Sequence, residues 1–198
     1  LLRNTNVIYP TVIYENLSDG AGSKWEGKKW TVLGDSNSAY SSLRTTYHEN
    51  IGTLNNITID NQARGGSGYI AKGSTGTSPT IIEQVALADP NSDLITFMAG
   101  GNDFSRSYPL DDFKEAVELT IQAIIEKYPT KTIGCFTQMP RGLNRGGTNN
   151  AGLTVEDYVL ATIELCKKYG IPVLNLYHHG NIYAWNQEFI ETYMEDGV

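Results

Sequence analysis

Short apolar runs alternate along this chain with longer segments in which apolar positions recur every three or four residues. Five runs have the apolar, β-prone composition of strands: 30–34 (WTVLG), 56–63 (NITIDNQA), 93–100 (DLITFMAG), 132–139 (TIGCFTQM) and 172–179 (PVLNLYHH). Most of them are apolar enough to be buried on both faces, as the strands of parallel sheets are. Buried strands separated by helices predict a parallel sheet with helices on both sides.

The segments between the runs predict amphipathic helices. Residues 110–129 begin with acidic residues and end at a proline, as helices do. The apolar face predicted there consists of Phe113, Ala116, Val117, Ile121, Ile124 and Ile125. Residues 154–172 follow the same pattern, with Thr154 as a candidate cap, and residues 37–52 are a further candidate helix. Together these elements predict a three-layer α/β/α sandwich around about five parallel strands.

The ends of the chain differ from its middle. Residues 1–28 are polar, are interrupted by one proline and three glycines, and show no sustained period. We interpret them as a leader or linker, and residues 29–198 as one domain, for which the length suffices. Because the sequence does not begin with Met, we expect it to be a piece of a longer protein or a processed form.

Composition and charge exclude several classes of partner. The chain carries 15 Lys and Arg against 22 Asp and Glu, a net charge of −7, without a basic cluster. Nucleic acid and anionic membrane surfaces are therefore not expected to bind through bulk electrostatics. No apolar run approaches the roughly 18 residues that cross a bilayer. Cys135 and Cys166 lie at apolar positions and are expected to be buried free thiols, although a disulfide is possible.

The first candidate for chemistry is Gly34-Asp35-Ser36, which ends the first predicted strand. A serine at that place exposes its hydroxyl at the edge of the sheet, with its own N–H near a helix N-terminus where an oxyanion is stabilised. This is a suitable position for a nucleophile. The alternative is that Asp35 or Ser36 only caps the following helix.

Two further short segments follow the second and third predicted strands. In "NQARGGSGY", adjacent glycines let the backbone approach a ligand and direct the N–H of Gly66 inward, although a tight turn explains them equally well. In "GGND", Asn102 can direct its side-chain amide to the same point, although it can also simply begin a turn. Donors from Ser36, Gly66 and Asn102 around one point would form an oxyanion hole. Turn formation alone explains three such segments at successive strand ends less well.

These ordered blocks resemble the SGNH, or GDSL-type, hydrolase family over residues 30–198: Ser36 in the first block, Gly66 in the second and Asn102 in G-x-N-D. The family's last block is D-x-x-H, and Asp196-Gly197-Val198 matches its first three residues. The resemblance implies a flavodoxin-like fold and serine esterase chemistry, without a metal or a cofactor. Ser36 would attack an ester, the donors of Ser36, Gly66 and Asn102 would hold the oxyanion, and Asp196 would orient a histidine base. We expect that histidine at position 199 of the parent protein.

The three histidines present are weaker candidates for the base. His48 is expected to be a surface or cap residue on the helix after the nucleophile, and His178 and His179 to end the fifth strand as pocket-wall residues. The substrate pocket is expected to include Asp35, Tyr69, Phe104 and His178. Aromatic rings near the blocks could stack on sugars or be ordinary half-buried residues: Tyr40, Tyr69, Phe104 and Tyr108.

The long loop 139–154 is expected to overhang the carboxyl edge of the sheet, as a substrate lid or as a solvated loop. Its Arg141 and Arg145 could meet an anionic substrate or remain solvated.

The first hypothesis is a serine esterase that acts on a small-molecule or polysaccharide ester, with an O-acetyl ester of a carbohydrate as first guess. The alternative is a non-catalytic carbohydrate-binding or adhesion module of a surface or phage-tail protein. An extracellular, cell-surface or phage-particle location is slightly favoured over a cytoplasmic one, and the oligomeric state is open.

Overall fold

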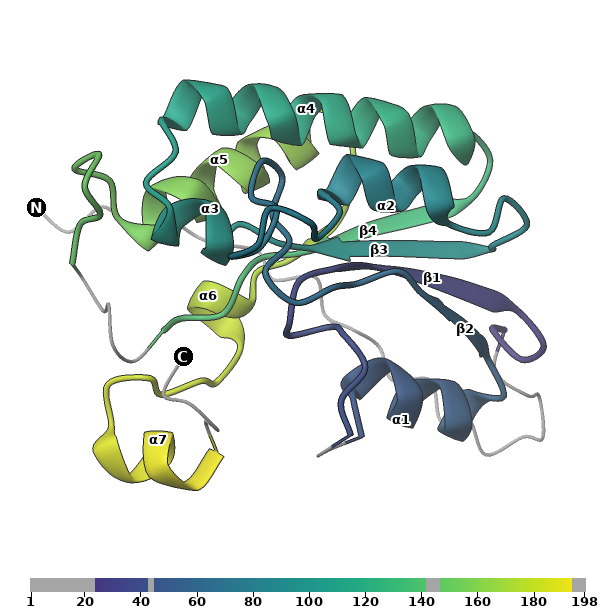
Figure 1. Cartoon of the computed structure of the whole chain (residues 1–198). Coiled ribbons are helices and arrows are strands. Elements are labelled where there is room, and N and C mark those ends of the chain that lie inside the picture. The colour runs from purple at the N-terminus through teal and green to yellow at the C-terminus, as the bar shows by residue number, and fades with distance from the viewer. Residues whose placement is uncertain (1–23, 43–44, 142–146, 194–198) are drawn as a thin grey trace, which may run out of the picture.

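The computed structural model describes residues 24–42, 45–141 and 147–193. Its centre is a five-stranded sheet in the order β2-β1-β3-β4-β5, in which every neighbouring pair is parallel (Figure 1). The strands are β1 (Lys29–Gly34), β2 (Thr58–Asn61), β3 (Leu94–Met98), β4 (Thr132–Phe136) and β5 (Val173–Leu174). The expected α/β class and parallel sheet are confirmed.

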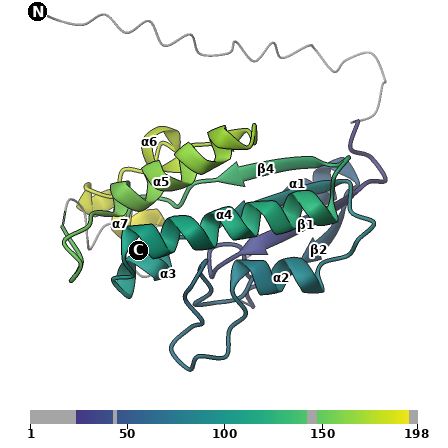
Figure 2. The same cartoon turned by 90° about the horizontal axis from the view of Figure 1, so that it is seen from above.

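Helices lie on both faces of this sheet and beyond the carboxyl ends of its strands. They are α1 (Tyr47–Asn55), α2 (Ile81–Leu87), α3 (Gly101–Ser105), α4 (Leu110–Lys127), α5 (Val155–Lys168), α6 (Leu176–His179) and α7 (Gln187–Tyr193). Helices α2, α4 and α5 pack side by side over one face, and α1 lies on the other (Figures 1 and 2). Right-handed crossovers produce this division, because the chain moves from β1 to β2 in one direction and then returns past β1 to β3, β4 and β5 in the other.

The two long helices form where their pattern predicts them. Helix α4 begins after Pro109, with acidic residues in its first turn and Lys127 in its last, which complements the helix dipole. Helix α5 begins with a capping box in which the Thr154 hydroxyl accepts from the Asp157 N–H and the Asp157 carboxylate accepts from the Thr154 N–H. Local capping and hydrophobic period therefore agree on both helices.

The main core fills the space between the sheet and the α2–α4–α5 layer. Leu33, Ile95 and Phe97 of the central strands are fully buried, as are Phe113 and Ile121 of α4. Burying one such side chain contributes about 1.5–3 kcal/mol, so these central strands are firmly fixed. The carboxyl ends of β1 and β3, which carry the candidate site, are thereby held on a rigid base.

Two predicted elements differ from the structure. Residues after Ser36 form a turn, and the helix begins only at Tyr47, because Thr46 and Glu49 form a capping box there. The fifth strand ends at Leu174, so the prediction that His178 and His179 end a strand is wrong. The Asn175 side chain accepts from the His178 N–H at 3.1 Å and starts helix α6 instead.

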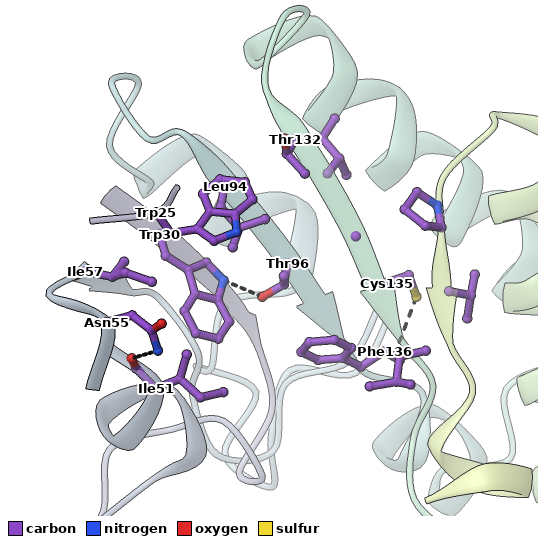
Figure 3. A pocket seen from close by; sticks show the side chains of 15 residues that line it. Trp25, Trp30, Ile51, Asn55, Ile57, Leu94, Thr96, Thr132, Cys135 and Phe136 are labelled. Carbon is purple, nitrogen blue, oxygen red and sulfur yellow. Dashed lines mark hydrogen bonds between the residues drawn. The ribbon is translucent and has the colours of Figure 1, made fainter. Parts of the chain in front are cut away.

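The face of the sheet that carries α1 has an open apolar groove of about 490 Å³ (Figure 3). Trp30 lies in its wall and donates from Nε1 to Thr96 Oγ1 at 2.8 Å. Ile51 of α1 lines one side, and Phe136 and Leu174 of the last two strands line the other. Within the described part of the chain, no candidate catalytic residue lines this groove.

Among the described helices, none combines the length and the apolar character needed to span a membrane.

Candidate active site

Ser36 lies two residues beyond the end of β1, at the carboxyl edge of the sheet, and is exposed. The N–H groups of Ser38 and Ala39 both donate to the Asp35 carbonyl, at 3.1 and 3.0 Å, which closes a tight turn around Ser36. The turn brings a serine hydroxyl to the surface at the end of a buried strand. That is the exposure that a nucleophile needs.

Asp35 supports this turn from beneath. Its Oδ1 accepts from the backbone N–H of Asn37 at 2.9 Å and from the Asn37 side chain at 3.0 Å. Burial raises the pKa of the Asp35 carboxyl to about 6, against the two opposing hydrogen bonds from Asn37 and the charge of Arg141. Asp35 caps the turn through these hydrogen bonds. Because its side chain is only 3% exposed, it does not form the open wall of a pocket.

Gln84 of α2 fixes the residue before the turn. Its Oε1 accepts from the Gly34 N–H at 2.8 Å, and its Nε2 donates to the Gly34 carbonyl at 2.9 Å. Gly34 itself is tightly surrounded, since a Cβ there would lie 2.9 Å from the Met98 carbonyl oxygen. Sequence reasoning missed Gln84, whose only signal was a polar residue on the buried face of a short helix.

His48 holds the other end of the turn. The expectation of a surface or cap residue is wrong, because His48 is fully buried. Its Nε2 lies 2.8 Å from the Ser38 carbonyl oxygen, to which the Asn61 side chain also donates at 2.9 Å. Burial lowers the pKa of His48, which favours the neutral ring. This histidine positions the turn of Ser36 and is not free to act as a base.

The second block forms a glycine-rich loop beside the turn. Gly66 has φ +79°, and a Cβ there would lie 2.7 Å from Gly73 Cα, so only glycine fits. Asn102 of α3 donates from Nδ2 to the Ser67 carbonyl at 2.8 Å, which ties the third block to the second. One amide hydrogen of Asn102 remains for a ligand. Among the described residues, the N–H groups of Ser36 and Gly66 have no acceptor.

Asp103 is a further organising residue, which the sequence identifies only as the last residue of the G-x-N-D block. Its carboxylate accepts the backbone N–H groups of Tyr69, Ile70 and Ala71 at 2.9 to 3.0 Å. Burial raises the pKa of Asp103, while the three hydrogen bonds act in the opposite direction. A Cβ on Gly68 would lie 2.3 Å from Asp103 Oδ2, so this contact also requires a glycine.

Two of the expected pocket aromatics are core residues. Tyr69 and Phe104 are each 3% exposed, and their rings pack edge-on against Phe113 and Tyr158 respectively. Neither ring has a face open to a sugar, so the expectation of stacking does not hold for them. The Tyr69 hydroxyl has no hydrogen-bond partner within the described part of the chain.

His178 contacts the carboxylate of a residue that is distant in the sequence. Its Nε2 lies 2.8 Å from Glu156 Oε1 of α5, and its Nδ1 lies 2.9 Å from Asn175 Nδ2. Both ring nitrogens therefore have partners, and neither is available to take a proton from Ser36. Asp196, the expected orienting carboxylate, lies outside the described residues.

Arg141 is the described arginine of loop 139–154. Its guanidinium donates to the Gly101 carbonyl at 3.1 Å and to Ser105 Oγ at 2.6 Å, both on α3. Further along the loop, Asn149 donates to the Phe104 carbonyl at 3.0 Å. These three hydrogen bonds anchor the described parts of the loop to α3. Arg145 lies outside the described residues.

Solved structures share this fold. A protein from Lactobacillus plantarum matches with a TM-score of 0.78 at 22% identity, over 87% of this chain and 88% of that one. A lipase/acylhydrolase from Enterococcus faecalis matches with a TM-score of 0.59 at 16% identity, over 86% and 85%. The acetyl xylan esterase AlAXEase matches with a TM-score of 0.55 at 15% identity, over 76% and 78%. At these identities the similarity establishes the fold.

The sequence comparisons are more specific. No curated protein matched the sequence significantly. The sequence model of the GDSL-like Lipase/Acylhydrolase family matches residues 19–197, nearly the whole chain. That range contains the three blocks, which include Ser36, Gly66 and Asn102. The chain therefore belongs to the GDSL-like lipase/acylhydrolase family.

Proposed function

We propose that this hydrolase is a serine esterase that cleaves a carboxylic ester through an acyl-enzyme, with Ser36 as the nucleophile. The observation that carries the proposal is the hydrogen bond from Asn102 Nδ2 to the Ser67 carbonyl, which joins the third block to the loop of Gly66. Together with the acceptor-free N–H groups of Ser36 and Gly66, it supports an oxyanion hole beside an exposed serine.

The reaction follows from these roles. Ser36 Oγ attacks the ester carbonyl carbon while its proton passes to a histidine base, and the carbonyl oxygen becomes an oxyanion held by the donors of Ser36, Gly66 and Asn102. The C–O bond to the alcohol then breaks, and the alcohol leaves with the proton. Water, activated by the same base, attacks the acyl-enzyme and releases the carboxylic acid and free Ser36.

The base is proposed to be a histidine that follows Val198 directly in the parent protein, with Asp196 as its orienting carboxylate. Two residues between aspartate and histidine place both side chains on one side of a helical turn, so the carboxylate can accept from Nδ1 and leave Nε2 facing Ser36. The occupied nitrogens of His178 and the burial of His48 support this choice. The orienting and base pair would thus come from beyond the described residues.

The substrate is proposed to be an O-acetyl ester of a carbohydrate. The loop beside Ser36 is built from Gly65, Gly66, Ser67 and Gly68, and a Cβ on Gly65 would meet no atom within 4 Å. This loop provides little wall for a long acyl chain. The similarity in fold to an acetyl xylan esterase agrees with this choice, and short lipid esters are the second choice.

The test is hydrolysis of p-nitrophenyl acetate by a chain extended past Val198, compared with its Ser36→Ala variant. We expect the variant to lose nearly all turnover, since removing a triad serine costs on the order of 10⁶ in kcat. Ser42→Ala, on an exposed serine beyond the turn, is the matched control and should retain the rate. Equal rates with and without the Ser36 hydroxyl would instead favour the non-catalytic carbohydrate-binding module.

A further inference from the structure

A hollow of about 410 Å³ lies in the segment that follows α6, apart from the groove on the sheet face. Its size falls within the range of about 300–1,000 Å³ that ligand pockets occupy. It is lined by Tyr183, Trp185, Asn186, Glu188, Phe189 and Thr192. Figure 1 shows α6 and α7 on the side of the sheet toward which the strand arrowheads point, which is the side of Ser36. None of the lining residues has a part in the ester chemistry described above.

Three aromatic rings form one wall of the hollow. Tyr183 contacts Trp185 at a centroid distance of 5.2 Å and Phe189 at 5.5 Å, with interplanar angles of 82° and 84°. Such edge-to-face contacts stabilise a fixed arrangement. Tyr183 and Trp185 are 46% and 57% exposed, while Ala184 between them is fully buried and anchors the segment. The rings are thus held in place with large parts of their surfaces in solvent.

Polar groups of both kinds border the same rings. Asn186 accepts from the Phe189 N–H through Oδ1 at 2.9 Å, which leaves its Nδ2 donors without an acceptor among the described residues. The Glu188 carboxylate has no hydrogen-bond donor within the same part of the chain. A ligand in the hollow would therefore meet an amide donor, a carboxylate acceptor and exposed aromatic surface.

This combination selects among ligands. A purely apolar acyl chain would leave Asn186 and Glu188 without partners, which is unfavourable. An anionic ligand such as a nucleotide would meet the Glu188 charge on a chain of net charge −7. A pyranose ring has apolar C–H faces that pack on aromatic rings and hydroxyl groups that both donate and accept.

From these contacts we infer that the hollow of residues 183–192 binds a sugar ring of the alcohol half of the substrate. The inference rests on the proposed function, because the hollow lies on the side of the sheet where Ser36 would cleave the ester. It names a neutral oligosaccharide as the class of ligand and makes Trp185 the main stacking residue.

The test is binding of xylohexaose, cellohexaose and chitohexaose to the 198-residue chain, followed by isothermal titration and tryptophan fluorescence. We expect at least one of them to bind with a Kd of about 1 mM or tighter, and Trp185→Ala to weaken that binding by about three- to tenfold. Trp185→Phe should restore most of the affinity, because a ring remains. Leu54→Ala, which removes an exposed apolar side chain of α1, is the matched control and should bind like the parent.

Circular dichroism of Trp185→Ala shows whether the fold is retained, and the Phe variant keeps the test valid if the Ala variant does not fold. Absence of binding for all three sugars at millimolar concentration would overturn the inference, as would equal affinity in parent and both Trp185 variants.

The proposed function is tested separately with p-nitrophenyl acetate, which contains no sugar. If hydrolysis depends on Ser36 but no sugar binds, the inference about the hollow is wrong and the proposed esterase function stands. If a sugar binds but hydrolysis does not depend on Ser36, the inference about the hollow stands and the proposed esterase function is wrong.

Discussion

The Gln84 side chain of α2 makes two hydrogen bonds to the backbone of Gly34. It accepts from the Gly34 N–H at 2.8 Å and donates to the Gly34 carbonyl at 2.9 Å. Gly34 is the last residue of β1, two positions before Ser36. The side chain of one helix therefore sets the position at which the turn of Ser36 leaves the sheet.

Replacing Gln84 with Leu should destabilise the protein and lower the proposed hydrolysis of p-nitrophenyl acetate. The change leaves the buried N–H of Gly34 without an acceptor, at a cost of about 1–3 kcal/mol in the free energy of unfolding. Urea denaturation measures this cost, and Gln122→Leu, on the exposed face of α4, provides the control. If both substitutions change the unfolding midpoint equally, Gln84 does not have this role.

Gly68→Ala should test whether the hydrogen bonds from the backbone N–H groups of residues 69–71 to the Asp103 carboxylate stabilise the fold. The new Cβ would lie 2.3 Å from Asp103 Oδ2, so the carboxylate must move and release backbone N–H groups of residues 69–71. We expect a loss of about 2–3 kcal/mol in unfolding free energy. Gly65→Ala meets no atom within 4 Å and should change stability by less than about 0.5 kcal/mol. Similar losses of stability in the two variants would show that the hydrogen bonds to Asp103 do not have this role.

Asp35→Asn should change how stability depends on pH. The folded-state pKa of Asp35 is raised from 3.8 to about 6, so the folded chain binds its proton more tightly than the unfolded chain. The resulting stabilisation is complete below pH 3.8 and is lost as pH rises through about 6. At 1.36 kcal/mol per pKa unit, the loss amounts to about 3 kcal/mol. Thermal unfolding from pH 4 to 8 should show a smaller decline in the variant, and parallel curves would refute the shift.

Tyr69→Phe should raise the stability of the protein. The Tyr69 hydroxyl is buried without a hydrogen-bond partner among the described residues, and its removal relieves a desolvation cost. We expect a gain of about 1 kcal/mol in the free energy of unfolding. Tyr158→Phe is the matched control. Its hydroxyl donates to the Tyr108 carbonyl, so its removal should lower the free energy of unfolding. A loss of stability in Tyr69→Phe as large as in the control would show that the hydroxyl has a partner.

The sequence predicted most of the sheet and both long helices, because those elements are set by local signals. The strand at 94–98 is a mostly apolar, mostly buried run, and helix α5 carries its own cap at Thr154 and its own apolar period. The misplaced elements are short. At Asn175 one side-chain hydrogen bond was enough to convert an expected strand end into helix α6.

The site was predictable only in its sequence blocks. Ser36, Gly66 and Asn102 were predicted as site residues because each follows a predicted strand in a short motif. The role of Gln84 was missed and that of His48 was predicted wrongly, because both depend on contacts with Gly34 and Ser38 that are made only when the chain folds. Periodicity identifies a buried position and does not show which backbone group a polar side chain there will reach.

The central claim is that Ser36 carries the acyl group during ester hydrolysis. The most direct measurement is mass spectrometry of the chain extended past Val198, quenched in acid during turnover of p-nitrophenyl acetate. We predict that one acetyl group is attached to the peptide containing Ser36, and that the adduct is absent from Ser36→Ala. An acetyl group on another residue, or undiminished hydrolysis by Ser36→Ala, would contradict the account.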